Sequence, residues 1–192
     1  MYVRGAKKHE EAWLLDRIDD LGLADRAFRS RDYAVAIDES SGEIAGFGRL
    51  RVHSDDPDDY CEVTTLGVLP AYREQGVGAH VVERLVERAR DRGFEAVYSL
   101  TNTGEYLTQF GFEAIEDDEL PGKLRERLAT IRDEEGSATA YRLSVSAFGM
   151  PHRLRTRFKR IGDEIEEEET EDRPEDFGID PESATYKYDT GR

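Results

Sequence analysis

The sequence has little that could cross-link the chain or carry it through a membrane. It contains one cysteine, Cys61, among 192 residues, which excludes an intramolecular disulfide and any metal site made of several thiolates. The longest stretches without a charged residue, 63–72 and 143–152, are ten residues each, whereas a membrane-spanning helix needs about 18 apolar residues or more. The N-terminal residues carry charges where a secretion signal is apolar. We therefore expect a cytoplasmic protein without a membrane partner, stabilised by the packing of its core.

Basic residues are outnumbered, and few of them are lysine. The formal net charge is −16, from 43 acidic and 27 basic residues, and only 5 of the basic residues are Lys. An acidic surface poor in lysine is typical of proteins from salt-loving archaea, although an acidic tail on the protein of a GC-rich mesophile would give a similar composition. Such acidity argues against nucleic-acid binding, because phosphate contacts need clustered Lys and Arg.

The acidic charge is concentrated at the C-terminal end. Residues 163–192 hold 13 acids and 3 bases, which leaves 30 acids and 24 bases in residues 1–162. The basic stretch 152–160 lies just before them and is interpreted as a surface helix whose charge the acidic run balances. We expect a compact domain at 1–147, a basic helix or linker at 148–162 and an acidic, flexible tail at 163–192. The tail could serve solubility, homodimerisation or occlusion of a substrate groove.

Hydrophobic patterning predicts alternating strands and helices over the compact domain. Expected strands are 2–6, 33–37, 43–52, 61–69, 94–100, 112–115 and 138–145, and expected helices are 11–21, 77–92, 105–110 and 121–132. The clearest helix has an apolar stripe from Val77 to Ala89 and ends before Gly93. The strands on either side of it should be parallel and joined by a right-handed crossover. Residues 54–59 are rich in Asp and are expected to form a loop.

The turn before this helix has the features of an anion site. The segment 73–78 reads Arg-Glu-Gln-Gly-Val-Gly and joins the fourth strand to the helix, where the first backbone N–H groups are unpaired and the helix dipole is positive. Gly76 and Gly78 lack side chains that would keep a phosphate away from those N–H groups. A tight strand-to-helix turn is the simpler alternative. The spacing fits neither a dinucleotide fingerprint nor a P-loop.

Two segments resemble the acetyl-CoA-binding motifs of the GNAT acetyltransferase superfamily. The stretch 66–79 contains the motif Arg-x-x-Gly-x-Gly between the fourth strand and the following helix, and 105–112 is a short aromatic helix ending in Gly-Phe. The resemblance covers about residues 2–147. It implies an α/β (α+β) fold with a mixed, mostly antiparallel sheet flanked by helices, in which the fourth and fifth strands are parallel and splay apart.

The resemblance also implies where acetyl-CoA would bind. Backbone groups of Leu66, Gly67 and Val68 would bind its pantetheine arm, and a backbone N–H near Val68 would polarise the acetyl carbonyl. The amides of the turn would hold its pyrophosphate, with the Arg73 side chain adding a charge pair. The residues of that turn are Arg73, Glu74, Gln75, Gly76, Val77, Gly78 and Ala79. No metal is expected, since the four histidines fall on different elements.

Two residues are candidates for acid–base chemistry. An amine must lose a proton before it attacks, and Glu62 is the candidate base, because GNAT enzymes often place a Glu on this strand. Period-two alternation puts it on one face with Thr64, Leu66 and Val68. It could instead be a surface carboxylate or bind the amine electrostatically. Tyr106 is the candidate acid for the departing thiolate, although the usual Tyr position holds Leu107; it could equally be a half-buried core aromatic.

Further likeness points to one branch of the superfamily. Residues 61–70, 99–103 and 119–128 look like the amino-acid-acetylating branch around N-acetylglutamate synthase, which implies that Arg49, Arg51 and Asn102 bind a substrate carboxylate; exposed strand charges are the alternative. We expect an acetyl-CoA-dependent N-acetyltransferase in which the primary amine of a small molecule or amino acid attacks directly in a ternary complex. A protein N-terminal or lysine acetyltransferase and a non-catalytic acetyl-CoA-binding module are the alternatives.

Overall fold

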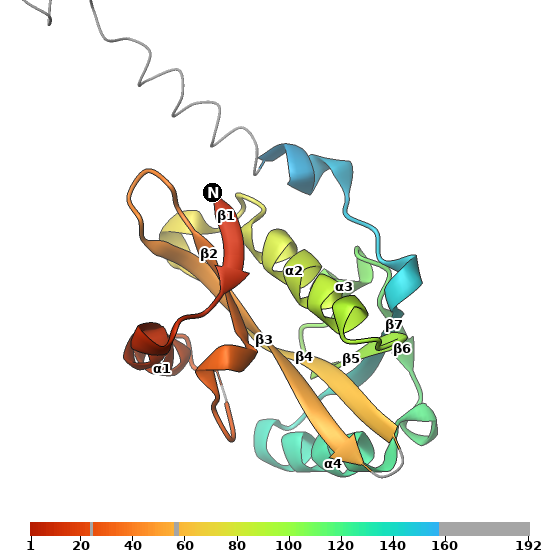
Figure 1. The fold of residues 1–192 in the computed structure, drawn as a ribbon. Coiled ribbons are helices and arrows are strands. Elements are labelled where there is room, and N and C mark those ends of the chain that lie inside the picture. The colour runs from red at the N-terminus through yellow and green to blue at the C-terminus, as the bar shows by residue number, and fades with distance from the viewer. Residues whose placement is uncertain (24, 56–57, 158–192) are drawn as a thin grey trace, which may run out of the picture.

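The computed structural model describes residues 1–23, 25–55 and 58–157 (Figure 1). Within these ranges one mixed sheet has the strand order β1-β2-β3-β4-β5-β7-β6. Its strands are β1 (Tyr2–Gly5), β2 (Tyr33–Ile37), β3 (Ile44–Asp55), β4 (Asp58–Val68), β5 (Ala96–Thr101), β6 (Glu113–Ile115) and β7 (Thr139–Ser144). Neighbouring strands are antiparallel except β4 and β5, which are parallel. The fold class expected from the sequence is confirmed.

Helices cover both faces of the sheet. The α-helices are α1 (Glu11–Asp20), α2 (Val77–Asp91), α3 (Glu105–Thr108) and α4 (Gly122–Glu135), and residues 152–157 are also helical. Short 3-10 turns lie at Lys8–Glu10, Ser30–Asp32, Pro70–Tyr72, Asp117–Glu119 and Val145–Ala147. No helix in the described ranges is both long enough and apolar enough to cross a lipid bilayer. The acidic stretch 163–192 lies outside the described residues.

The α2 helix packs against one face through the apolar stripe that the sequence indicates. Val81, Val82 and Leu85 are buried there against strand residues such as Leu50 and Val63. Two glycines of β3 allow this close approach: a Cβ at Gly46 or at Gly48 would lie 2.8 Å from a valine methyl group of α2. The opposite face is covered by α1, which packs on β2 and β3, and by α4, which packs on β5 and β7 (Figure 1).

The prediction that all of residues 54–59 form a loop is wrong. The strand β3 continues to Asp55 and β4 begins at Asp58, so that Ser54 pairs with Asp59 and Asp55 with Asp58. Only residues 56–57 of this segment lie outside the described ranges. The Asp-rich composition favours a loop, but the β3–β4 pairing extends into this segment. Strand formation depends on cross-strand pairing more than on the local preference of each residue for strand or loop. Lys123 from α4 also donates a hydrogen bond to the carbonyl oxygen of Ser54.

A bulge in β4 reverses the side-chain alternation at its C-terminal end. Thr65 has φ of 52°, and the register shifts there, with Thr64 opposite Arg49 but Gly67 opposite Phe47. Two residues of β4 therefore oppose one residue of β3. Leu66 and Val68 pack with the α2 cluster, whereas Glu62 faces α4. The expectation that Glu62 shares a face with Leu66 and Val68 is wrong, because period two holds only in a strand without a bulge.

Candidate active site

The strands β4 and β5 separate next to Glu62. Their parallel register covers only two pairs within the described strands, Cys61 with Val97 and Glu62 with Tyr98. Beyond these pairs the hydroxyl of Ser99 donates to the carbonyl oxygen of Val63 at 3.0 Å, so a side chain takes the place of a backbone ladder bond. The separation leaves backbone groups of β4 open to a ligand beside a buried carboxylate.

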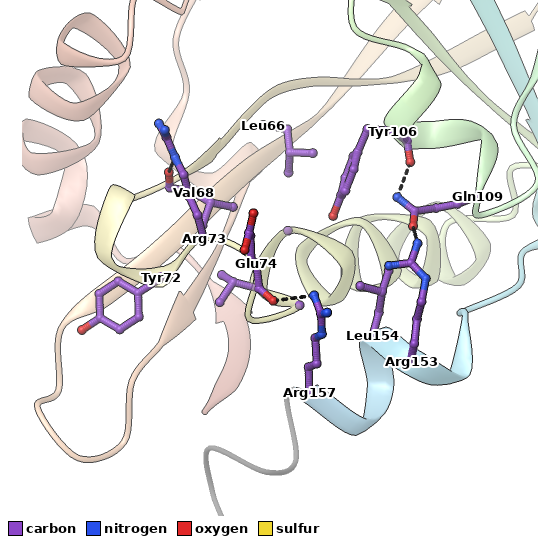
Figure 2. A pocket seen from close by; sticks show the side chains of 13 residues that line it. Leu66, Val68, Tyr72, Arg73, Glu74, Tyr106, Gln109, Arg153, Leu154 and Arg157 are labelled. Atoms are coloured by element: carbon purple, nitrogen blue, oxygen red, sulfur yellow. Dashed lines mark hydrogen bonds between the residues drawn. The ribbon is translucent and has the colours of Figure 1, made fainter.

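A cavity of about 400 Å³, called here the α2 cavity, lies at the N-terminal end of α2 (Figure 2). Its lining residues are Leu66, Val68, Tyr72, Arg73, Glu74, Gly76, Val77, Gly78, Tyr106, Gln109, Arg153, Leu154 and Arg157. The cavity thus brings together seven of the ten residues expected to bind acetyl-CoA. Of the other three, Gly67 lies beneath Phe47 on the far face, Ala79 is buried in the core, and the Gln75 side chain donates to the Ala71 carbonyl at 2.9 Å.

The start of α2 is suited to an anion. Gly76 precedes the helix with φ of 81°, and none of the described side chains caps the first turn, which also lacks an acidic residue. The first N–H groups of a helix have no partner within it, so an uncapped start can bind phosphate. Gly78 leaves room for this approach, since a Cβ there would lie 2.9 Å from the Tyr106 hydroxyl. The residues present therefore fit the diphosphate of CoA.

A second cavity of about 790 Å³, called here the α4 cavity, opens on the other side of the strand separation. Its lining residues are Gly22, Leu23, Arg26, Val63, Thr64, Thr65, Leu66, Ser99, Leu100, Thr101, Asn102, Thr103, Tyr106, Leu107, Arg127, Thr130, Ile131 and Glu134. Leu66 and Tyr106 line both cavities. Two ligands, one in each cavity, would meet at these two side chains.

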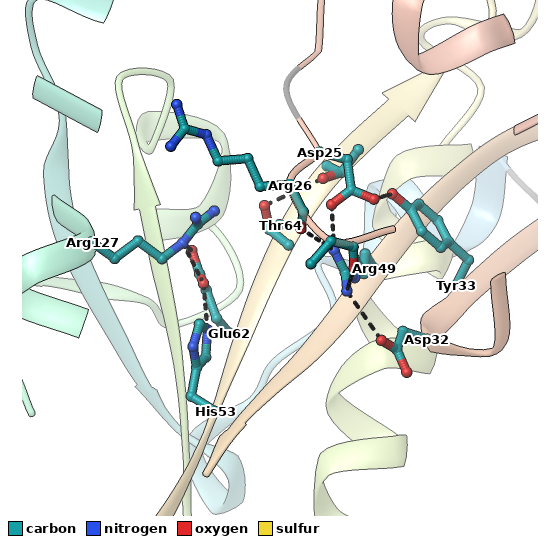
Figure 3. Close-up of polar contacts among 11 residues, drawn as sticks. Asp25, Arg26, Asp32, Tyr33, Arg49, His53, Glu62, Thr64 and Arg127 are labelled. Carbon is teal, nitrogen blue, oxygen red and sulfur yellow. Dashed lines mark hydrogen bonds and ion pairs between the residues drawn. The ribbon is translucent and has the colours of Figure 1, made fainter. Parts of the chain in front are cut away.

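Glu62 is held in a polar cluster with Arg127 and His53 (Figure 3). Its side chain is 0% exposed, and Nε of Arg127 donates to its two carboxylate oxygens at 3.1 and 2.9 Å. Nε2 of His53 lies 2.8 Å from the same carboxylate. Arg127 lines the cavity and Glu62 does not, so Arg127 stands between the cavity and the carboxylate. Sequence reasoning missed Arg127, because nothing in the pattern of helix 121–132 distinguishes it from Arg125.

Tyr106 and Leu107 point to different surroundings. Leu107 is 5% exposed and packs in the core cluster of α2, although it also lines the α4 cavity, whereas Tyr106 is 39% exposed and lies in the wall of both cavities. An edge-to-face contact with Phe110, 5.4 Å between ring centroids, holds the ring. Burial of the hydroxyl raises the pKa of Tyr106 to about 12, against a smaller opposing effect of Arg153. The phenol is therefore protonated at neutral pH.

Only one of the three expected carboxylate-binding residues lines the α4 cavity. Asn102 is exposed there. Arg51 lies opposite Glu62, and its pKa is lowered by burial and by the neighbouring charge of Arg127. Arg49 is neither an exposed charge nor part of the cavity wall: its side chain is 2% exposed, and it pairs with Asp25.

Arg49 holds the loop that borders the α4 cavity (Figure 3). Besides Asp25, its guanidinium contacts Asp32 at 3.2 Å and donates to the carbonyl oxygens of Arg26 and Ala27 at 3.2 and 2.8 Å. The Tyr33 hydroxyl donates to the same Asp25 carboxylate. Since Arg26 lines the cavity, Arg49 anchors a loop that forms part of the cavity wall.

Among the described residues, neither a reactive thiolate nor a cluster of metal ligands is found. Burial raises the pKa of Cys61 to about 12, and its thiol donates to the Ala96 carbonyl at 3.2 Å, so the thiol stays protonated. No cluster of three or more His, Cys, Asp or Glu side chains that could hold a metal ion occurs in residues 1–23, 25–55 and 58–157.

Comparison with known proteins points to one family. Residues 4–112 match the Acetyltransferase (GNAT) family. A region of 100 residues is 31% identical to the amino-acid acetyltransferase of Neisseria meningitidis and covers 48% of this chain but 22% of that enzyme. The chain thus spans about a fifth of this curated relative.

Solved structures share the fold. N-acetylglutamate synthase from Neisseria gonorrhoeae, complexed with coenzyme A and N-acetyl-glutamate, matches with a TM-score of 0.61 and 22% identity, over 74% of this chain and 34% of that one. Rv2747 from Mycobacterium tuberculosis, in complex with CoA and NLQ, matches with a TM-score of 0.63 and 20% identity, over 75% of this chain and 99% of that one. With its parallel, separating β4 and β5, its uncapped α2 and a family match over more than half of its length, the chain belongs to the GNAT acetyltransferase family.

Proposed function

We propose that the protein is an acetyl-CoA-dependent N-acetyltransferase that acetylates the amine of an amino acid. The observation that carries this proposal is the meeting of two cavities at Leu66 and Tyr106, beside the point where β4 and β5 separate. GNAT enzymes use acetyl-CoA, whose thioester supplies the activated acetyl group. The α2 cavity fits the donor, and the α4 cavity is then the place of the acceptor amine.

Coenzyme binding is assigned to the backbone at the start of α2 and along the end of β4. The N–H groups of the first turn, with Gly76 and Gly78 leaving them uncovered, bind the diphosphate. Backbone groups of Leu66 and Val68 bind the pantetheine arm, at the part of β4 that β5 leaves unpaired. The N–H groups in this part of β4 also polarise the acetyl carbonyl, an effect worth about 10²–10³ in rate.

Glu62 is assigned the role of proton acceptor. A free amine has a pKa near 10 and must lose a proton before it attacks. Glu62 is the buried carboxylate next to the strand separation, but Arg127 covers it on the cavity side. The proton therefore reaches Glu62 through a water molecule or after a movement of Arg127. General-base help of this kind contributes about 10²–10⁴ in rate.

Tyr106 is assigned to the departing sulfur. Its hydroxyl lies at the junction of the two cavities, and its raised pKa of about 12 keeps the O–H intact at neutral pH. It can therefore donate a hydrogen bond to the thiolate as the thioester breaks. A thiol has an ordinary pKa near 8.5, so stabilisation by a hydrogen bond is sufficient for its departure.

The charges around the α4 cavity favour an acceptor with a carboxylate. Arg127 uses its Nε on Glu62, and no terminal amino group of Arg127 bonds to another described residue. Arg51 lies opposite Glu62, and the positive charges of Arg51 and Arg127 repel each other. Two arginine charges therefore lie near the single carboxylate of Glu62. The α-carboxylate of an acceptor bound to Arg127 would offset this excess of positive charge. The meningococcal relative, named an amino-acid acetyltransferase, supports the same acceptor class.

Matched acceptors test the proposal. Acetyl-CoA is incubated with amino acids including glutamate, with their α-amides, with polyamines and with short peptides, in dilute buffer and in molar KCl, and products are identified by mass. We expect N-acetyl amino acids, formed faster than the corresponding N-acetyl amides. Acetylation of peptides alone would indicate that the acceptor is a protein rather than a free amino acid. Binding of acetyl-CoA without any product would favour a non-catalytic module.

A further inference from the structure

The chain returns to the α2 cavity after its last strand. Phe148 stacks on Phe110 with ring centroids 6.0 Å apart, and the N–H of Gly149 donates to the Phe110 carbonyl at 3.1 Å. Leu154, in the short helix 152–157, is buried in the cluster beneath α2. These contacts fix a segment that lies outside the family match of residues 4–112.

The anchored segment places two arginines in the cavity wall. Arg153 and Arg157 are one helical turn apart, and both line the α2 cavity with Leu154 between them (Figure 2). Nη2 of Arg153 donates to Oε1 of Gln109 at 2.6 Å, and Nη1 of Arg157 donates to the carbonyl oxygen of Glu74 at 3.0 Å. Glu74 belongs to the turn that leads into α2, so Arg157 lies against the proposed diphosphate site.

Neither charge is neutralised in the described structure. The partners of Arg153 and Arg157 are an amide oxygen and a backbone carbonyl, and among the described residues no carboxylate pairs with either guanidinium. Arg155, between them in sequence, differs: it pairs with Glu83 at 2.8 Å and does not line the cavity. The segment thus adds two positive charges, without a carboxylate partner among the described residues, to a cavity whose wall already contains Arg73, Glu74 and an uncapped helix start.

We propose that Arg153 and Arg157 bind the phosphate groups of CoA, so that this C-terminal segment forms the second wall of the coenzyme site. The inference rests on the proposed function, which places acetyl-CoA in the α2 cavity. Arginine binds phosphate through several N–H groups at once, and such charge-assisted hydrogen bonds are stronger than neutral ones. We expect each arginine to strengthen acetyl-CoA binding by about tenfold or more.

Calorimetric titration of the full chain tests this. The variants are Arg153→Gln, Arg157→Gln and, as a control with the same charge change on the same helix, Arg155→Gln. The ligands are acetyl-CoA, its 3′-dephospho form, and S-acetylpantetheine, which lacks all phosphates. We expect Arg153→Gln and Arg157→Gln to weaken acetyl-CoA binding about tenfold or more and S-acetylpantetheine binding by less than twofold, with Arg155→Gln close to wild type. The dephospho form shows whether each arginine acts on the 3′-phosphate or on the diphosphate.

Two results would overturn the inference while leaving the proposed function intact. One is that Arg153→Gln and Arg157→Gln weaken acetyl-CoA binding no more than Arg155→Gln does. The other is that they weaken S-acetylpantetheine equally, which would indicate a general disturbance of the cavity. Thermal unfolding of each variant checks that the fold is intact. Failure of the wild-type chain to bind acetyl-CoA at all would instead overturn the proposed function, and this inference with it.

Discussion

Arg127 of α4 and Glu62 of β4 form an ion pair in which one guanidinium nitrogen, Nε, donates to both carboxylate oxygens, at 3.1 and 2.9 Å. The Glu62 side chain is fully buried, whereas that of Arg127 is 20% exposed and lines the α4 cavity. A carboxylate that binds the terminal amino groups of Arg127 would therefore be separated from the proposed base, Glu62, by the Arg127 guanidinium. In the proposed function, acceptor binding and proton removal would therefore be joined at this pair.

Replacing Arg127 should affect acceptors according to their charge. With Arg127→Gln, we expect kcat/KM for an amino acid to fall about tenfold to a hundredfold, because a charge-assisted hydrogen bond to the acceptor is lost. The loss should be smaller for the α-amide of the same amino acid, which serves as the control. The measurement is kcat/KM on both acceptors. An equal loss on both would show that Arg127 acts only through Glu62.

Arg49 should matter for stability rather than for acceptor charge. Arg49→Met leaves Asp25 buried without its cation, a change that costs about 3–5 kcal/mol of unfolding free energy. Arg17→Met is the matched control, since Arg17 and Asp20 form an exposed pair at 2.7 Å whose loss costs at most about 1 kcal/mol. Urea unfolding measures both. Equal destabilisation of the two variants would contradict the buried-network account.

Stability should depend on pH through Glu10. Hydrogen bonding from Arg4, at 2.9 Å, lowers the pKa of Glu10 from its ordinary value of 4.5. A carboxylate with a lowered pKa stabilises the fold above the ordinary value and loses this contribution as the pH falls through the lowered one. Glu10→Gln should therefore be less stable than wild type at pH 7, with the difference narrowing below pH 4.5.

Chemical unfolding of wild type and Glu10→Gln at pH 7 and pH 3.5 gives this comparison. Adding Arg4→Gln to the Glu10→Gln variant should change stability little, since the partner is already absent. A difference between wild type and Glu10→Gln that stays constant across this pH range would contradict the assignment to the Arg4–Glu10 pair.

Tyr106→Phe separates the hydroxyl of Tyr106 from its ring. The ring contact with Phe110 should persist, so we expect an unchanged fold and unchanged acetyl-CoA binding. The rate of acetyl transfer in a single turnover should fall by about 10²-fold, at the lower end of what a positioned acid contributes. An unchanged single-turnover rate would mean that the thiolate leaves without help from Tyr106.

Features set by local pattern could be predicted from the sequence. The helix α2 follows from the apolar stripe Val77–Ala89, and the tight turn at its start follows from Gly76 and Gly78, because both depend on neighbouring residues. The placement of Leu66 and Val68 could not be predicted, since the bulge at Thr65 arises from pairing with β3 and a threonine gives no sign of positive φ.

Features that depend on tertiary contacts are harder to predict from the sequence. Glu62 could be selected from its strand and its family motif, but the residue that covers it, Arg127, comes from a helix 65 positions later in the chain. Arg49 looked like an exposed strand charge or a substrate ligand, because alternation says nothing of the loop residues Asp25 and Asp32 that enclose it. Long-range ion pairs of this kind depend on how loops and helices pack.

Glu62→Gln gives the most direct test of the account. It removes the proton-accepting carboxylate while leaving the shape of the side chain, and so separates coenzyme binding from the chemical step. The measurement follows acetyl-CoA binding by calorimetry and N-acetyl amino acid formation by mass, with thermal unfolding to confirm that the variant is folded. We expect acetyl-CoA affinity within about twofold of wild type and product formation reduced by about 10²–10⁴-fold at neutral pH. Wild-type rates of product formation in a folded Glu62→Gln variant would contradict the role of Glu62 as the proton acceptor.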